Sequence, residues 1–105
     1  MGRVRRGCGN WDATPGFGVL LTNESGAATW PVTGATFILM PKQPNDVAAA
    51  TAALKFFDWA YAKGGKMAEE LDYVPMPGSV VAAVHRLWAA QIKDPAAKPI
   101  YTLPK

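Results

Sequence analysis

The sequence has very few of the residues that build disulfides and metal centres. Its 105 residues include one cysteine, Cys8, and one histidine, His85. A single cysteine excludes an internal disulfide and a multi-cysteine metal site, and a single histidine excludes a His-rich metal cluster. Apolar runs are also short, as at 37–41, whereas a helix that crosses a bilayer needs about 20 apolar residues. We therefore expect no metal, and no segment that spans a membrane.

The chain also has little excess charge of either sign. Three of the 11 basic residues, Arg3, Arg5 and Arg6, account for the net charge of +3, and the other eight balance the eight acidic residues. Binding along a nucleic acid requires Lys and Arg gathered on one face of the protein. We therefore expect no nucleic-acid partner. Residues 1–9 are basic but no apolar stretch follows them, so we do not expect a secretory signal there.

What the chain does have is apolar residues. They make up 50% of the sequence, against 18% charged residues, which is typical of a folded chain rather than a disordered one. The length allows one small domain, which can bury roughly two-thirds of the surface of its unfolded chain.

Two short strands are predicted in the first half of the chain. The first covers 17–22 and is weakened by Gly18. The second covers 36–40, where consecutive apolar residues favour a strand buried on both faces. Pro41 ends this second strand because proline has no N–H to donate.

After Asn45 the apolar residues recur every three or four positions, which predicts helices. Asn45 or Asp46 can cap the first helix, and the pair Gly64–Gly65 ends it, with Gly64 in the left-handed conformation. A short helix is predicted over 66–71, and another begins at Pro77 and ends at 93–95. We expect the tail, 96–105, to be mostly irregular. The apolar faces of the two longer helices consist of Val47, Ala50, Leu54, Phe57 and Tyr61, and of Val80, Val81, Val84, Leu87 and Trp88.

This set of elements is unbalanced. A strand buried on both faces needs a neighbouring strand at each edge and helices above and below it, and two strands do not make a stable sheet. The sequence therefore predicts part of an α/β domain, rich in helix and with one or two orphan strands, whose other strands are missing or come from another chain.

Two blocks of sequence carry a specific resemblance. They are Phe-Phe-Asp-Trp-Ala-Tyr at 56–61 and Leu-Asp-Tyr-Val-Pro-Met-Pro at 71–77. With the segment 30–40 before them and the tail up to Tyr101, they resemble the C-terminal end of PstS, the family of periplasmic phosphate-binding proteins of the bacterial phosphate ABC transporter. The resemblance covers residues from about 11 to 101.

The resemblance implies a fold and a function. The family has two α/β lobes, a type II periplasmic-binding-protein fold, and a length roughly three times that of this chain. It implies inorganic phosphate as the ligand, ABC transporter permease subunits as partners and the periplasm as the location. Residues 11–105 would then be a partial binding-protein domain with a hinge-crossing strand and the last helices.

The family's phosphate ligands lie in earlier segments, and none of them matches this sequence. We therefore assign no phosphate-binding residue to the chain, and we expect it to bind no phosphate alone. Residues 1–10 do not match the family either. A frameshifted reading of GC-rich codons, or a mis-assigned start, would account for this block of Arg and Gly.

Each residue that could carry chemistry has a plainer interpretation, which we prefer. His85 has no ligand or carboxylate three or four residues away, so we expect a packing or surface histidine. Glu69, Glu70 and Asp72 are typical of a solvated face, and Cys8 of an incidental thiol in the terminal segment.

For the aromatic and glycine motifs we also prefer a structural interpretation. Phe57 and Tyr61 lie on the apolar face of the predicted helix, so the aromatic group at 56–61 favours core packing over stacking on bases or sugars. The glycines at 15–18 predict a plain turn, because no Lys-Ser or Lys-Thr follows them. Trp30 and Tyr73 lie near prolines, and the resemblance to a hinge region would allow them to gate a cleft, but this is not the interpretation we prefer.

We therefore expect no catalytic residues, no cofactor and no enzyme. The function that the resemblance implies is the binding component of a phosphate transporter, present as a C-terminal fragment. The alternative is a small helical interaction module whose exposed apolar faces dock on a partner or on a copy of itself.

Overall fold

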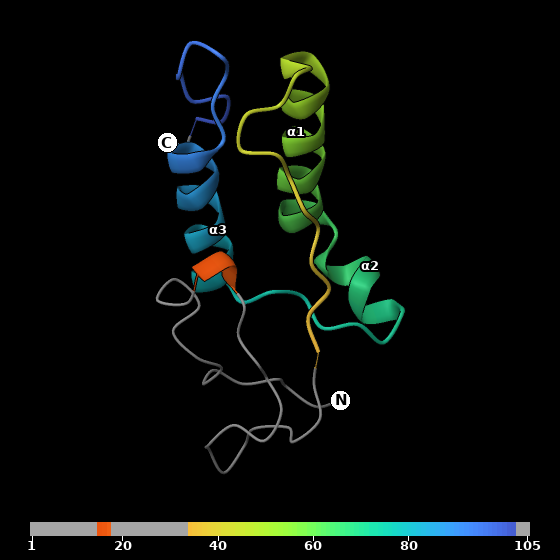
Figure 1. The fold of residues 1–105 in the computed structure, drawn as a ribbon. Helices are drawn as coiled ribbons and strands as arrows, with labels where there is room; N and C mark the ends of the chain where they lie inside the picture. The colour runs from red at the N-terminus through yellow and green to blue at the C-terminus, as the bar shows by residue number, and fades with distance from the viewer. Residues whose placement is uncertain (1–14, 18–33, 103–105) are drawn as a thin grey trace. The chain divides into compact units, whose positions relative to one another are not determined.

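All the regular structure that can be described consists of helices. The computed structural model describes residues 15–17 and 34–102. In these residues a 3₁₀ turn, η2 (Pro15–Phe17), precedes α1 (Val47–Lys63), α2 (Gly65–Glu70) and α3 (Gly78–Gln91). The chain divides into two compact units, 1–38 and 39–105, and α1, α2 and α3 all belong to the second unit (Figure 1).

The described part of the first unit consists of the turn η2 and of residues 34–38, which have no regular secondary structure. Gly16 and Phe17 both have positive φ angles, of 66° and 58°, and the turn expected from the Pro-Gly pair is confirmed. The predicted strand at 17–22 fails at its first residue, because Phe17 lies in η2; residues 18–22 lie outside the described part.

The predicted strand at 36–40 is wrong. Within residues 15–17 and 34–102 there is no β-strand, and one isolated bridge joins Lys93 to Pro99. Phe37, Ile38 and Leu39 are 50%, 62% and 93% exposed. A strand needs a partner for its backbone N–H and C=O groups, and the described residues supply none to this segment. The helix-rich character expected from the sequence is thus confirmed, whereas the described residues contain no sheet.

Helix α1 begins where the sequence predicts. Asp46 is the N-cap residue, and its side chain accepts a hydrogen bond of 3.0 Å from the backbone N–H of Ala49. Asp46 thereby takes the capping role that the sequence left open between it and Asn45. The apolar face is confirmed in the middle of the helix, since Ala50 and Leu54 are buried.

Replacing Asp46 by alanine removes this cap. We expect the free energy of unfolding to fall by about 1 kcal/mol, measured by urea unfolding followed by circular dichroism. Asn45→Ala is the matched control, because Asn45 precedes the N-cap position. Equal stabilities of the two variants would contradict the assignment of the cap to Asp46.

Gly64 separates α1 from α2 in a way that the sequence did not predict. Its backbone is right-handed, with φ −79° and ψ −9°, so the predicted left-handed conformation is wrong. Glycine is required there by a close approach, since a Cβ atom at Gly64 would lie 2.6 Å from the carbonyl oxygen of Ala60. The right-handed backbone also lets α2 start at once, at Gly65 rather than at Lys66.

Helix α3 starts after Pro77 and ends before the predicted stop at 93–95. Pro77 is the N-cap residue, one position ahead of its expected place, and the helix ends at Gln91. Ile92 then turns to an extended conformation and the chain folds back on itself. The backbone N–H of Lys93 donates to the carbonyl of Lys42 (2.9 Å), and that of Ile100 donates to Ile92 (3.2 Å).

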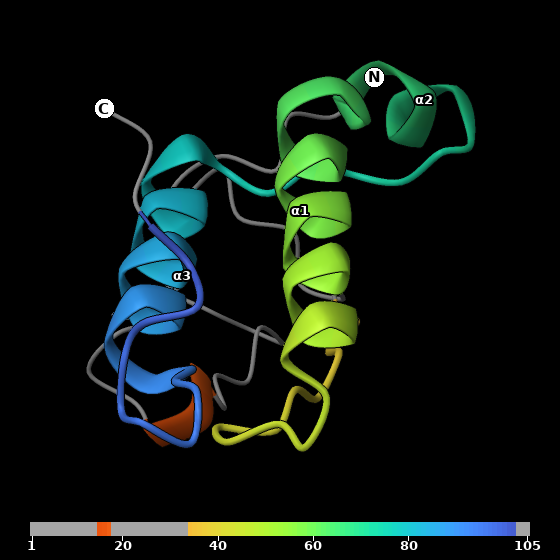
Figure 2. The ribbon, with the colours of Figure 1, turned by 90° about the horizontal axis from the view of Figure 1, so that it is seen from above.

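The core of the second unit lies between two antiparallel helices. Figures 1 and 2 show α1 and α3 side by side with opposite directions, and the segment after α3 returning along them. The buried residues that form one cluster are Leu54 of α1, Trp88 of α3, and Ile92 and Tyr101 of the returning segment. The partly buried side chains packed against them are Met40, Phe57, Val84, Ala89 and Ile100. The tail is therefore irregular, as expected, but it is also part of the core.

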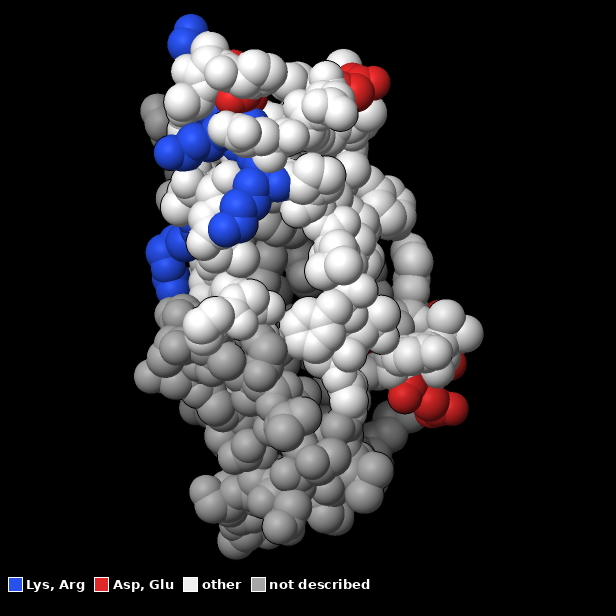
Figure 3. Space-filling view, in the orientation of Figure 1, with Lys and Arg blue, Asp and Glu red and all other residues white. Residues whose placement is uncertain are grey.

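The charged side chains of this unit are mixed on the visible face. Figure 3 shows several Lys and Arg side chains on the α3 side, and Asp and Glu side chains both near the top of the unit and over α2. The acidic residues that follow the start of α2, Glu69, Glu70 and Asp72, are exposed, so their interpretation as a solvated face is confirmed. None of the described helices is both long and apolar enough to cross a bilayer.

Candidate functional site

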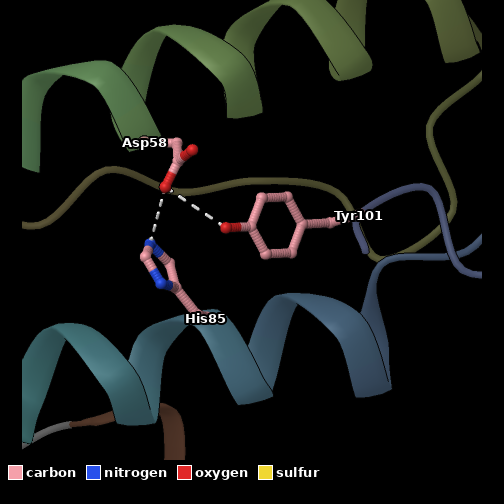
Figure 4. Close-up of polar contacts among 3 residues, drawn as sticks. All are labelled: Asp58, His85 and Tyr101. Carbon is pink, nitrogen blue, oxygen red and sulfur yellow. Dashed lines mark hydrogen bonds and ion pairs between the residues drawn. The ribbon is translucent and has the colours of Figure 1, made fainter. Parts of the chain in front are cut away.

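The polar cluster of the second unit joins three separate segments. Asp58 comes from α1, His85 from α3 and Tyr101 from the segment that follows α3 (Figure 4). The Tyr101 hydroxyl donates a hydrogen bond of 3.2 Å to Oδ1 of Asp58. The same oxygen lies 3.1 Å from Nε2 of His85.

The helical repeat places these side chains toward one another. Asp58 follows Leu54 by four residues, and His85 precedes Trp88 by three, so each shares a helix face with a core residue. Tyr101 reaches the cluster because the chain folds back after Gln91. The three residues are 27 and 16 positions apart along the chain, so only the tertiary structure brings them together.

The contact between His85 and Asp58 is close but poorly directed. Nε2 of His85 is buried and lies within ion-pair distance of the carboxylate, yet it makes no aligned hydrogen bond. The His85 side chain is 13% exposed, and that of Asp58 is 42% exposed. We conclude that the contact is electrostatic when the imidazole carries a proton, and that water screens it on the Asp58 side.

Aromatic rings surround the imidazole on its other sides. The ring centroids of Trp88, Tyr101 and Tyr61 lie 5.2, 5.4 and 6.1 Å from that of His85. Trp88 and Tyr101 also meet edge to face, with centroids 5.2 Å apart. The expectation that His85 is a packing residue is confirmed.

The position of Tyr101 changes its acidity. Burial raises the pKa of the Tyr101 phenol above its ordinary value of 10.0, and both the negative charge of Asp58 and the hydrogen bond to it raise this pKa further. Burial also raises the pKa of Tyr61. A raised pKa in the folded protein means that the unfolded chain loses the proton first as the pH increases.

This shift predicts a loss of stability in alkali. The contribution of Tyr101 to the free energy of unfolding is fully present below about pH 10, which is the pKa of the phenol in the unfolded chain. This contribution is lost as the pH rises through the higher pKa of Tyr101 in the folded protein. Tyr101→Phe removes the ionisable group. We therefore expect its free energy of unfolding to fall less steeply than that of the wild type above about pH 10.

Urea unfolding at a series of pH values measures the two slopes, and Tyr61→Phe serves as the matched comparison for the second shifted tyrosine. If wild type and Tyr101→Phe lost stability in parallel above the pKa of free tyrosine, the raised pKa of Tyr101 would be wrong.

The chemistry of the cluster is that of a structural tie. Among the described residues no group of three or more His, Cys, Asp and Glu side chains could hold a metal ion. In the same part of the chain, no hydroxyl or thiol hydrogen-bonds to His85 as an activated nucleophile would. The cluster joins α1, α3 and the returning segment at one carboxylate oxygen.

The other candidate residues do not converge on this cluster. Phe57 packs against the core, as expected, but Phe56 and Trp59 are 59% and 49% exposed. Core packing, the preferred interpretation of the aromatic block, is therefore wrong for Phe56 and Trp59. Tyr73 is exposed too, and Trp30 lies outside the described residues, as does Cys8.

Sequence reasoning missed the cluster itself. A search at three or four positions from His85 finds no carboxylate, because the partner is on another helix. The signal that was present is that Asp58 lies beside the apolar face of α1, between Leu54 and Tyr61, where a charged side chain needs a partner.

Comparison with known proteins identifies the relatives of the chain. No family model matches it. The chain is 43% identical to the phosphate-binding protein PstS of Haemophilus influenzae over 84 residues, which are 80% of this chain and 25% of that protein. It is 41% identical to PstS of Pasteurella multocida over 91 residues, 87% of this chain and 26% of the relative. PstS of Xylella fastidiosa, strain Temecula1, is 42% identical over 84 residues, 80% of this chain and 23% of the relative.

The aligned share of this chain is much larger than the aligned share of each relative. The alignments take in most of this chain, but the chain spans only about a quarter of the length of the curated relatives it matches. The helix-rich structure without a sheet in its described part is consistent with a piece of a larger binding protein. Over at least four-fifths of its length, the chain is therefore a PstS-type sequence that corresponds to about a quarter of a PstS protein.

Proposed function

We propose that the chain is the C-terminal part of a phosphate-binding protein of a phosphate ABC transporter. The complete protein would have the type II periplasmic-binding-protein fold, capture inorganic phosphate in the periplasm and deliver it to the permease subunits. The observation that carries this proposal is the identity of 41–43% to proteins named phosphate-binding protein PstS, over 80–87% of the chain.

In this proposal residues 11–105 form a partial binding domain, and 1–10 are not part of it. The segment 36–40 is a strand that forms only when neighbouring strands are supplied. Its exposed Phe37, Ile38 and Leu39 support this interpretation, because apolar side chains in such a run are normally buried. Helices α1 and α3 and the returning segment then act as a scaffold that covers one side of a lobe.

The phosphate ligands belong to the other three-quarters of the protein. The N-terminus of α1 is the end of a long helix where an anion could be held by free N–H groups, but the Asp46 carboxylate already occupies it. A second anion beside this carboxylate would be repelled. The Lys and Arg side chains on the α3 side (Figure 3) lie on the open surface, where water screens their charge.

Calorimetric titration with inorganic phosphate tests the proposal on two proteins. The first is the chain itself, for which we expect no binding above background. The second is a chimera in which the matched 84-residue segment of Haemophilus influenzae PstS is replaced by the corresponding residues of this chain, and for which we expect binding like that of the parent protein. A folded chimera without affinity for phosphate would contradict the proposal, and so would micromolar binding by the chain alone.

A further inference from the structure

The segment 36–40 has a backbone and side chains without a partner in the described part of the chain. None of its N–H or C=O groups hydrogen-bonds to another described residue. Phe37, Ile38 and Leu39 are 50%, 62% and 93% exposed. A backbone with unpaired donors and acceptors is a template on which another chain segment can pair as a strand.

One end of this segment is held by the second unit. Met40 packs against the buried cluster that contains Leu54, and two residues further on the carbonyl of Lys42 accepts the hydrogen bond from Lys93. The segment is thus tethered beside a folded core. Pairing at this place orders fewer residues than pairing between free peptides, so it costs less conformational entropy.

The composition of the segment favours a strand. Thr36, Phe37 and Ile38 are residue types with high strand propensity, and 36–40 contains no glycine, proline or charged residue. Short segments of this kind readily pair with the same segment of another chain. Pro41, which has no N–H to donate, limits the length of the strand that can form.

A second copy of the segment is a matching partner for it. If two copies run antiparallel with all five residues in register, Ile38 lies opposite Ile38 of the second copy, and Phe37 lies opposite Leu39. Directly opposite aromatic and aliphatic side chains stabilise a pair of strands. The two-fold symmetry makes this Phe–Leu contact twice.

Charge also permits two copies to meet here. The sequence has no Lys, Arg, Asp or Glu between Glu24 and Lys42. In the register centred on Ile38, Lys42 lies opposite Gly34, so the pairing places no like charges directly opposite each other, which would be destabilising. The segment offers no charge to a partner that recognises charge, whereas its apolar side chains match those of its own copy.

We propose that two copies of this chain form a symmetric dimer in which the segments 36–40 pair as antiparallel strands. The proposal goes beyond the proposed function, because it concerns the chain as it stands and not a complete phosphate-binding protein. A strand of five residues buries less area than a standard interface, so the dimer is weak, with a dissociation constant of about 0.1 mM.

Sedimentation velocity over a range of about 10 to 500 μM measures the association. For the wild-type chain we expect the mass to rise from one chain toward two. Ile38→Lys places two lysines opposite each other at the two-fold axis, so we expect the dissociation constant to increase by about tenfold or more. Leu71→Lys is the matched control, because it makes a similar change at another highly exposed residue, outside the segment, and we expect it to associate like the wild type.

A charge reversal tests the register. Ile38→Glu alone is expected to associate as poorly as Ile38→Lys, whereas an equal mixture of the two variants should dimerise again, because Glu and Lys then lie opposite each other. Circular dichroism checks that both variants keep their helices, as expected for changes at a residue that is 62% exposed. Infrared spectroscopy should show a strand signal that grows with protein concentration in the wild type.

A wild-type chain that stays monomeric at every concentration would overturn the proposal. So would a dimer that Ile38→Lys leaves intact, or one that Leu71→Lys weakens equally. A strand signal that is independent of concentration would show that another part of the same chain is the occupant, and would also overturn it.

Discussion

Leu54→Ala is expected to lower the free energy of unfolding by about 3 kcal/mol, within the range for large-to-small changes in protein cores. Leu54 is 1% exposed and is the largest fully buried side chain in the described residues. It lies in the cluster with Trp88, Ile92 and Tyr101, so the shortened side chain leaves a cavity bordered by both helices and the returning segment. A small domain has little stability in reserve, and this loss is a large fraction of the total.

Urea unfolding followed by circular dichroism measures the effect. Leu71→Ala is the matched control, because Leu71 is 71% exposed and its truncation removes little buried area. A stability difference between the two variants below about 1 kcal/mol would contradict the assignment of Leu54 to the centre of the core.

Tyr101→Ala is expected to have an effect of similar size, about 3 kcal/mol. The ring is 8% exposed, lies edge to face against Trp88 and contacts His85. Its removal also deletes the hydrogen bond to Asp58, which joins the returning segment to α1. The change thus tests whether an irregular tail contributes to the core as much as a helix does.

Tyr101→Phe separates packing from hydrogen bonding. It keeps the ring and removes the hydroxyl, so we expect a loss of only about 1 kcal/mol at neutral pH. Thr102→Ala, at an exposed position of the same segment, is the control for a general effect of changing the tail. The interpretation fails if Tyr101→Ala and Thr102→Ala unfold at the same urea concentration.

The sequence was most informative about the helices. Helix formation and capping depend on interactions between residues only a few positions apart in the sequence. The apolar repeat and the capping residues that predict a helix are therefore visible in a short stretch of sequence. The start of α1 at Asp46 and the break at Gly64 were therefore accessible. The conformation of Gly64 was not, because it depends on the approach of the Ala60 carbonyl and on the immediate start of α2.

The strand at 36–40 shows the opposite case. Its apolar run is typical of the interior of a sheet, but a strand is completed by other strands, which the described part of the chain does not supply. For the same reason, only part of the aromatic block at 56–61 is packed in the core. Phe57 has a core to enter, whereas Phe56 and Trp59 point to the side of α1 where no described residue buries them.

By itself the sequence determined the helical segments and the relationship to phosphate-binding proteins, because local periodicity and residue identity carry that information. The tertiary structure alone decided that the tail joins the core and that Asp58, His85 and Tyr101 meet at one carboxylate oxygen. It also decided which aromatic side chains of α1 are left exposed. These outcomes depend on contacts between residues far apart along the chain, and such contacts exist only after the helices have packed.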